Sequence, residues 1–217
     1  MKSTAARLVL LGVLLLGPPC SAQEDVGKIV RRFLPPGADL VEFVKANPRT
    51  GKIVQRSLAV LSGHIAGPKS RDIVFAYHTN LKEVEGRPLF VALLHKTDSG
   101  YVKIFEKTYY NRYLWAQDFS TVGLKLLSVP ANQQQLLAVT TAIGASLGAT
   151  VEVLAWDDVD GLVNTMPGNN SVRHVLFSED KPVLLVTLSF EKYPREQGVP
   201  PPQVYRWDGR RFVKNAR

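Results

Sequence analysis

The pattern of apolar and polar positions along the chain changes close to residue 40. From Val26 to Leu34 the apolar residues recur at helical spacing until Pro35-Pro36-Gly37, which predicts a short amphipathic helix over residues 25–34. Beyond it, β-branched and aromatic runs are broken by Gly, Asp, Asn and Pro, which is typical of strands joined by turns. The predicted strands are Ile53–Val60, Asp72–His78, Leu89–His95, Val102–Tyr109, Leu124–Val129, Gln135–Thr141, Val151–Trp156, Arg173–Phe177, Pro182–Phe190, Val204–Trp207 and Arg211–Val213.

Three groups of these strands follow the same order. In each, a buried-looking strand leads through a variable loop to a second strand and then to a tight turn, from which a third strand leaves. The turns are Asp98-Ser99-Gly100, Asp160-Gly161 and Asp208-Gly209, and glycine suits them because hairpin turns demand positive φ. The chain is therefore predicted to be all-β, with three repeated antiparallel sheet units over about residues 53–109, 120–165 and 173–214 and a short N-terminal helix. A partial propeller-like arrangement and a sandwich both fit this pattern.

Three short segments resemble a known group of proteins. The segments Phe33-Leu-Pro-Pro-Gly-Ala38, Ile73-Val-Phe-Ala-Tyr77 and Val204-Tyr-Arg-Trp-Asp-Gly209 are similar to those of bacterial exported proteins with FG-GAP or VCBS-like β repeats. The resemblance implies a repeated-sheet architecture, and nothing in it implies catalysis. Blades of that group usually carry a calcium-binding Asp-x-Asp-Gly loop before the first strand, whereas the corresponding segments 63–72, 130–135 and 178–181 lack the paired aspartates. The resemblance therefore supports the architecture rather than metal binding.

The first 22 residues have the pattern of an export signal. Lys2 and Arg7 precede a ten-residue apolar run that is too short to span a bilayer, and Cys20 and Ala22 have the spacing of a cleavage site. Residues 1–22 are therefore predicted to be a signal peptide and residues 23–217 a single β-rich repeat domain that is secreted or periplasmic. The alternative is a lipoprotein cut before Cys20 and anchored through it.

The cysteine count and the distribution of charge limit the kinds of bond and partner that the chain can have. Cys20 is the only cysteine, so cleavage after Ala22 would leave a chain whose stability depends on core burial without a disulfide. The formal net charge is +8, and most basic residues are scattered along the chain. Local basic clusters occur near the two ends and could form a polyanion-binding face, but no aromatic-interleaved stripe accompanies them, so no nucleic-acid partner is expected. The clusters are Lys28, Arg31 and Arg32, and Arg210, Arg211, Lys214 and Arg217.

Aromatic residues suggest both a core and a binding surface. Trp156 and Trp207 occupy matching positions in two repeats, which favours packing between units. Consecutive polar-tipped aromatics cannot all face one core, so one stretch is the candidate surface for a protein or glycan partner outside the cytoplasm. Pairing through sheet edges could in addition form a homo-oligomer. The candidate surface comprises Tyr109, Tyr110, Arg112, Tyr113 and Trp115.

Metal and cofactor chemistry has weak support in the sequence. Asp157, Asp158 and Asp160 form a Ca²⁺ candidate, but the ligand spacing is incomplete and a solvated hairpin turn explains the same residues. Histidines 64, 78, 95 and 174 show no metal-ligand spacing, although His78 and His95 could face each other if their strands pair. No cofactor and no metal are expected.

The main hypothesis is an exported, non-enzymatic binding or structural module. Gly144-Ala-Ser146-Leu-Gly148 matches the letters of a nucleophile elbow, but a strand follows it where an elbow needs a helix, so no catalytic residue is assigned. The alternative is a small secreted hydrolase or carbohydrate-active enzyme that uses dispersed carboxylates, two of which would have to converge in a pocket. The carboxylates in question are Glu83, Glu85, Asp98, Asp157 and Asp158.

Overall fold

The computed structural model of the protein describes residues 25–46, 50, 53–79, 88–110, 113–114, 123–129, 134–142, 149–166, 171–178, 183–188 and 203–215. The described part is mostly strand with one short N-terminal helix, so the all-β prediction is confirmed. Helix α1 (Val26–Arg31) begins where the side chain of Asp25 accepts a hydrogen bond from the Gly27 backbone N–H, at 3.1 Å. The helix is shorter than predicted.

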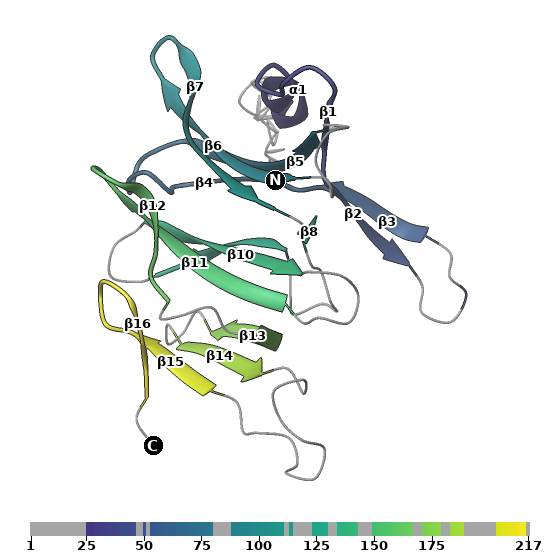
Figure 1. Ribbon diagram of the computed structural model, residues 1–217. Coiled ribbons are helices and arrows are strands. Elements are labelled where there is room, and N and C mark those ends of the chain that lie inside the picture. Colours follow the sequence, from purple (N-terminus) through teal and green to yellow (C-terminus); the bar gives the residue numbers. More distant parts are fainter. Residues whose placement is uncertain are drawn as a thin grey trace, which may run out of the picture.

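The first sheet unit is an antiparallel meander of four strands. It runs through β4 (Val60–Gly63), β5 (Asp72–Thr79), β6 (Leu89–Thr97) and β7 (Gly100–Tyr109). The short strand β1 (Ala38–Leu40) continues the same edge of β5 that β4 occupies. Between β1 and β4 the chain forms a separate hairpin that projects from the body (Figure 1); its strands are β2 (Glu42–Ala46) and β3 (Ile53–Leu58).

The second and third units repeat this meander. The second runs through β9 (Leu124–Ser128), β10 (Gln135–Ala142), β11 (Ala149–Asp157) and β12 (Gly161–Asn164), and β8 (Tyr113–Leu114) extends the β9 edge of β10. The third runs through β13 (Ser171–Ser178), β14 (Val183–Leu188), β15 (Gln203–Trp207) and β16 (Phe212–Lys214). A short pairing between β11 and β13 joins the second and third units at one point.

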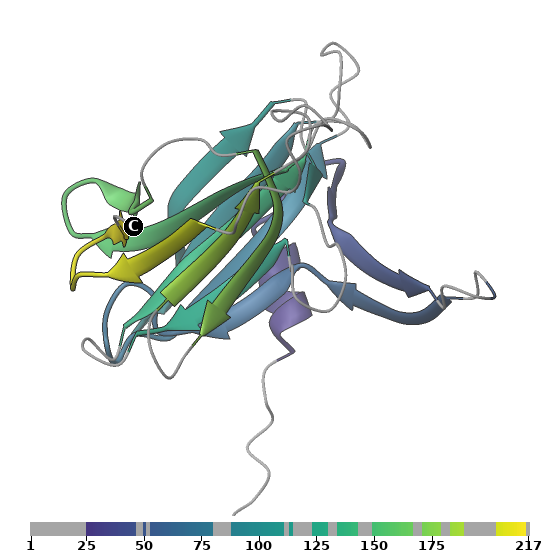
Figure 2. The ribbon, with the colours of Figure 1, turned by 90° about the horizontal axis from the view of Figure 1, so that it is seen from below.

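The three units lie as successive layers, with α1 on the outer face of the first (Figures 1 and 2). Side chains of β5 alternate between the layers: Ile73, Phe75 and Tyr77 pack with α1, whereas Val74 and Ala76 pack against the second unit. A strand buried on both faces has an almost continuous apolar sequence, as β5 has.

The two equivalent tryptophans pack between units, as predicted. Trp156 lies against the core shared by the first and second units, and Trp207 against the core shared by the second and third. On β11 the alternation directs Val151 and Val153 toward the third unit and Leu154 toward the first. The first and second units thus each contribute one face to each of two cores.

All eleven predicted strands are present, but one run is divided. Ala59 interrupts Ile53–Val60 because its N–H donates to the Val41 carbonyl (2.8 Å) and its carbonyl accepts from Ala76 N–H (3.0 Å). The chain therefore passes at Ala59 from the projecting hairpin into the first unit. Three short strands were not predicted, namely β1, β2 and β8, whereas β12 is the strand that was expected to leave the Asp160-Gly161 turn.

The glycines of the three repeated turns have the expected conformation. Gly100, Gly161 and Gly209 have φ values of 135°, 74° and 104°. Gly100 and Gly161 begin the last strand of their meanders, and Gly209 lies in the turn before β16. This region of φ favours glycine because it has no Cβ. Within the described residues, no helix combines the length and apolar character needed to cross a membrane.

Candidate binding groove

The structure separates the aromatic residues of the predicted surface. Tyr109 is buried, and its hydroxyl donates to Glu152 Oε2 at 2.6 Å, so its side chain joins the first and second units. Tyr110, the next residue, is 69% exposed. Tyr113 belongs to the short strand β8, with its side chain outside the described part, and Arg112 and Trp115 lie outside the described residues. Because Tyr109 is buried, it does not belong to the exposed surface in which the sequence analysis placed it. Alternate residues of a strand point to opposite faces, so a run of consecutive aromatics is divided between them.

The acidic turn between β11 and β12 is organised by its own backbone. Asp157 Oδ1 accepts hydrogen bonds from the N–H groups of Val159 (2.9 Å) and Asp160 (3.0 Å), and these bonds hold the pKa of Asp157 below its usual value. Asp158 Oδ1 accepts from Trp156 Nε1 at 3.0 Å. Where the structure describes side chains, no three His, Cys, Asp or Glu residues are grouped so that they could hold a metal ion.

The carboxylates of the enzyme hypothesis do not converge where they are described. Asp98 is exposed in the β6–β7 turn, whereas Asp157 and Asp158 are exposed in the β11–β12 turn. Glu83 and Glu85 lie outside the described residues, as does the Gly144–Gly148 segment. Asp98 therefore lies in a different turn from Asp157 and Asp158.

His78 and His95 lie at opposite ends of the β5–β6 ladder. His78 pairs with Leu89, whereas His95 pairs with Asp72, so the two rings do not face each other. His78 Nδ1 is 3.2 Å from the Pro88 carbonyl oxygen, and His64 Nδ1 contacts the Ser70 carbonyl. The side chain of His174 is outside the described part.

Asp72 closes the loop between β4 and β5. Its buried Oδ2 accepts hydrogen bonds from the N–H groups of Ile65 (2.7 Å) and Ala66 (2.8 Å) and from Ser70 Oγ (2.5 Å), and His95 Nδ1 lies 2.8 Å from Oδ1. Both carboxylate oxygens thus have partners, which is what a buried charge requires. The group is a structural centre: Ser70 bonds to the aspartate rather than to the histidine, so it is not a nucleophile–base pair.

A groove lies between the end of β12 and the β15–β16 hairpin. Two adjoining hollows of about 600 and 360 Å³ share Asn164, Thr165 and Arg211. We call these two hollows together the β12–β16 groove. One wall consists of Asn164, Thr165 and Met166, and the other of Arg210, Arg211, Phe212, Val213 and Lys214; Trp156, Asp157 and Asp208 line the end of the larger hollow.

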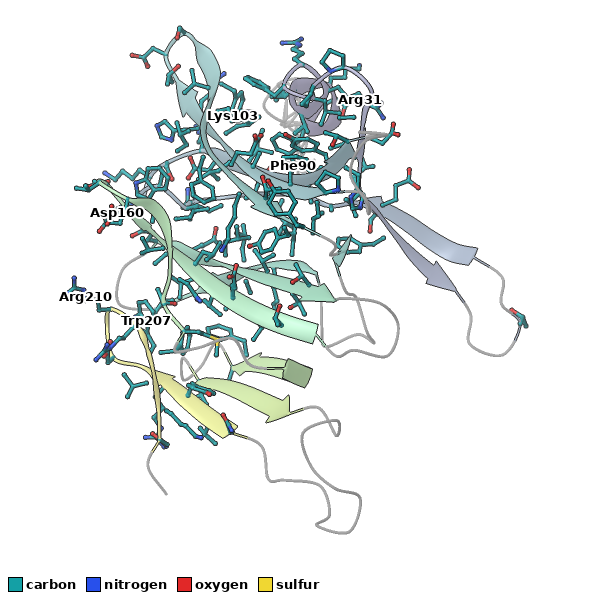
Figure 3. All side chains as sticks on the ribbon, in the orientation of Figure 1. Arg31, Phe90, Lys103, Asp160, Trp207 and Arg210 are labelled. Atoms are coloured by element: carbon teal, nitrogen blue, oxygen red, sulfur yellow. The ribbon has the colours of Figure 1, made fainter. Side chains whose placement is uncertain are left out.

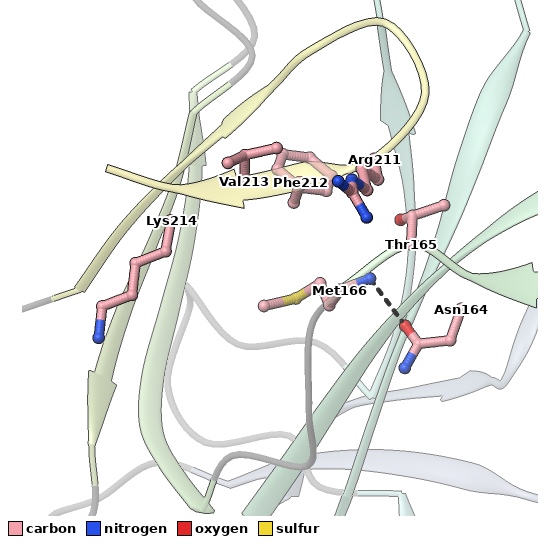
Figure 4. A pocket seen from close by; sticks show the side chains of 7 residues that line it. All are labelled: Asn164, Thr165, Met166, Arg211, Phe212, Val213 and Lys214. Atoms are coloured by element: carbon pink, nitrogen blue, oxygen red, sulfur yellow. Dashed lines mark hydrogen bonds between the residues drawn. The ribbon is translucent and has the colours of Figure 1, made fainter. Parts of the chain in front are cut away.

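Backbone hydrogen bonds fix the two walls of the β12–β16 groove. Thr165 follows β12 and is held by its N–H (2.8 Å) and its Oγ1 (2.7 Å), both of which donate to the Val153 carbonyl. Phe212 N–H then donates to the Thr165 carbonyl at 3.0 Å, which brings β16 against the end of β12. Figure 4 shows Met166 between Lys214 and Arg211, with its N–H bonded to Asn164 Oδ1 at 3.1 Å.

The side chains of the β12–β16 groove combine positive charge with apolar surface. Arg210, Arg211 and Lys214 are exposed, and Figure 3 shows Arg210 at the outer tip of its hairpin. Val213 is 41% exposed, whereas Met166 and Phe212, one in each wall, are buried.

Asp208 is the acidic neighbour of these cations. Its Oδ1 accepts from the N–H groups of Arg210 and Arg211, both at 2.8 Å, and these bonds hold the pKa of Asp208 below its usual value. Its Oδ2 lies 3.8 Å from Arg211 Nε in an exposed pair. Such pairs are weak, so the guanidinium remains able to bind a second anion.

Sequence reasoning identified only one wall of this site. Arg210, Arg211 and Lys214 were recognised as a local basic cluster, and Trp156 as a repeated aromatic position. The opposite wall at Asn164–Met166 carries no motif, because its role depends on where β12 ends relative to β16. No protein-family profile, curated protein or solved structure matches the chain.

Proposed function

We propose that the protein is an exported, non-enzymatic binding module whose β12–β16 groove binds a partner rich in carboxylate groups. The observation that supports this most directly is the line of cations along one wall, Arg210, Arg211 and Lys214, beside the apolar surface of Met166 and Val213. Grooves that combine a mostly apolar lining with a few charged groups are typical of binding sites.

The chemistry of the cations favours carboxylates. Arginine presents a planar fork of N–H donors that matches the two oxygens of a carboxylate, and Arg210 and Arg211 provide two adjacent forks. The carboxylates of Asp157 and Asp208, which line the same end, already accept two backbone hydrogen bonds each. They therefore hold their turns in place and leave the arginines as the groups that face a ligand.

The predicted leader supports a site of action outside the cytoplasm, either in a secreted or periplasmic form or in a lipoprotein anchored at Cys20. The resemblance to exported FG-GAP or VCBS-like repeat proteins supports the same location. A partner in that location would be a protein or a glycan with acidic groups.

The test is a titration of the uniformly ¹⁵N-labelled mature chain with poly-L-glutamate, followed by NMR. We expect amide shifts to concentrate at residues 162–166 and 208–214, because these line the β12–β16 groove. The variant Arg210→Gln/Arg211→Gln should weaken binding about tenfold, as two charge-assisted contacts are lost.

The matched control is Lys69→Gln/Arg71→Gln. Both residues are exposed, and they lie in the β4–β5 loop, so this variant removes the same charge from another part of the surface. If both variants weakened binding equally, poly-L-glutamate binding would depend on net charge alone, and the proposed site would be rejected. Shifts confined to residues outside the groove would reject it as well.

A further inference from the structure

Strand β7 forms an open edge of the first unit (Figure 1). It pairs with β6 on one side, and in the described part of the chain no strand pairs with its other side. Lys103 and Glu106 are exposed, and Val102 is 41% exposed, so solvent reaches this edge. A long edge strand presents backbone donors and acceptors to any strand that lies beside it.

The hydrogen bonds of the neighbouring strands identify which backbone groups of β7 point outward. Lys96 N–H donates to the Arg71 carbonyl at 2.9 Å, toward β5, so the backbone groups of Lys96 do not reach β7. Alternate residues of an antiparallel ladder bond to opposite sides. Since Lys96 is paired with Tyr101, both Tyr101 and Lys103 direct their N–H and C=O groups away from β6.

The second half of β7 follows the same rule. Ala76 N–H donates to the Ala59 carbonyl at 3.0 Å, away from β6, so the next residue of β5 bonds to Phe90 of β6. Phe90 is paired with Thr108, so Thr108 and Glu106 also direct their backbone groups away from β6. Among the described residues, no backbone hydrogen bond to another element uses the outward groups of β7.

A β-bulge separates the two halves of β7. Lys103 and Phe105 pair with successive residues of β6, so Ile104 is an extra residue between them. The bulge places Lys103 and Glu106 on one face, although residues three apart in a regular strand lie on opposite faces. Their contacts confirm this arrangement, because Glu106 Oε2 accepts from Lys103 Nζ and from the Tyr77 hydroxyl, both at 2.7 Å.

The outward residues of β7 are symmetric about this bulge. They are Tyr101, Lys103, Glu106 and Thr108. If a second copy of β7 lies antiparallel across a two-fold axis at the bulge, each Lys103 stands opposite Glu106 of the other copy. A bulge ordinarily shifts the register against a second strand. Here both strands carry the same extra residue at the same place, so the register and the faces agree.

We propose that β7 is a self-association surface, at which a second copy of this chain adds its own β7 in antiparallel orientation. The first sheets of the two copies then form one continuous sheet. The Lys103–Glu106 contact occurs twice, and opposite charges directly across a strand pair are favourable. On the other face, the exposed Val102 lies opposite Lys107 of the second copy, whose aliphatic stem covers it. This surface shares no residue with the β12–β16 groove.

The first test is charge complementation, measured by sedimentation velocity on the mature chain from about 1 μM to about 1 mM. We expect a concentration-dependent dimer. Lys103→Glu places acidic groups opposite each other and Glu106→Lys places basic groups opposite each other, so each variant alone should dimerise about tenfold more weakly. An equimolar mixture of the two variants restores opposite charges at both contacts of a mixed dimer, and it should associate like the wild type.

The matched control is Lys69→Glu mixed with Asp39→Lys. These residues are exposed in the first unit but lie outside β7, so each control variant should dimerise like the wild type even without the other. Glu106→Lys also removes the acceptor of the Tyr77 hydroxyl. If this variant fails to fold, Glu106→Gln keeps an oxygen for that hydroxyl, and it should weaken dimerisation about fivefold.

Amide hydrogen exchange, followed by NMR, tests the backbone pairing without any substitution. The four outward N–H groups of β7 should become protected only at concentrations at which the dimer forms. Those of Val102 and Lys107, which belong to the alternate set that faces β6, should be protected at every concentration.

Each contrary outcome rejects this surface. A chain that stays monomeric up to about 1 mM would overturn the proposal. So would a dimer whose outward β7 amides exchange as fast as in the monomer, or a mixture of the charge variants that associates no better than either variant alone. The poly-L-glutamate titration reads residues 162–166 and 208–214, so failure of either proposal is seen separately from failure of the other.

Discussion

Trp156 and Trp207 occupy equivalent positions in the second and third units, yet only Trp156 has a hydrogen-bond acceptor for its indole. Trp156 Nε1 donates to Asp158 Oδ1 at 3.0 Å, whereas the Trp207 Nε1 is buried without a partner in the described part of the chain. The reason lies two residues on, because Gly209 stands where the second unit has Asp158. Gly209, whose φ is 104°, has no side chain, so this turn offers the Trp207 indole no carboxylate acceptor at that position.

This difference predicts unequal costs for the same substitution. Trp207→Phe removes a buried, unpartnered donor, whereas Trp156→Phe removes a bonded one, so Trp207→Phe should lower the free energy of unfolding by about 1 kcal/mol less than Trp156→Phe. Urea denaturation measures both. Asp158→Ala provides the check: it should reduce stability in the wild-type chain and have little effect once Trp156 is phenylalanine. An equal effect in both backgrounds would show that the indole bond contributes nothing.

Replacement of Asp72 should be the most damaging single change in the first unit. Asp72→Ala would leave two backbone N–H groups and the His95 ring without this acceptor, which we expect to cost about 3 kcal/mol or more. Asp72→Asn keeps one carbonyl oxygen and should cost less. Asp39→Ala, at an exposed position of β1, is the control and should change stability by less than about 0.5 kcal/mol. Similar unfolding midpoints for Asp72→Ala and Asp39→Ala would contradict the role assigned to Asp72.

Gly63 lies at a close approach between the first and second units. A Cβ at this position would lie 2.2 Å from Gln135 Oε1 and 2.4 Å from Leu126 Cδ1, the ends of two flexible side chains, so Gly63→Ala should displace these side chains and destabilise the protein by about 1 kcal/mol. Gly67 lies in the loop after β4 and has no atom within 4 Å of its virtual Cβ, so Gly67→Ala should be close to neutral. Thermal unfolding of the two variants compares them directly. A neutral Gly63→Ala would mean that β4 and β9 can separate without cost.

Acid should remove part of the stability supplied by two turns. The pKa values of Asp157 and Asp208 are lowered chiefly by backbone hydrogen bonds, which favour the charged carboxylate in the folded state. A depressed pKa stabilises the fold above the unfolded value, about 4, and this contribution is lost as the pH falls through the lower folded value. Asp157→Asn/Asp208→Asn should therefore be less stable than wild type at pH 7, and the difference should shrink toward pH 2. A difference that does not change with pH would contradict this linkage.

The sequence by itself determined the strands, the repeated turns and the order in which they follow one another. These features depend on local properties: Asp72–Thr79 is apolar because both faces of β5 are buried, and Gly100, Gly161 and Gly209 are required where φ is positive. Local rules also indicated that Trp156 and Trp207 pack between units. They could not reveal that the chain changes partner at Ala59, from β2 to β5, since that change depends on strands distant in the sequence.

Only the tertiary structure decided which charged residues act together. Arg210, Arg211 and Lys214 are a short basic run in the sequence, and they become one wall of a groove only because Phe212 N–H meets the Thr165 carbonyl across two units. In the same way, Tyr109 became an internal contact and Tyr110 an exposed side chain through the register of β7. Both results depend on contacts between residues far apart in the chain. Such contacts are set by how buried faces pack, which a linear pattern does not specify.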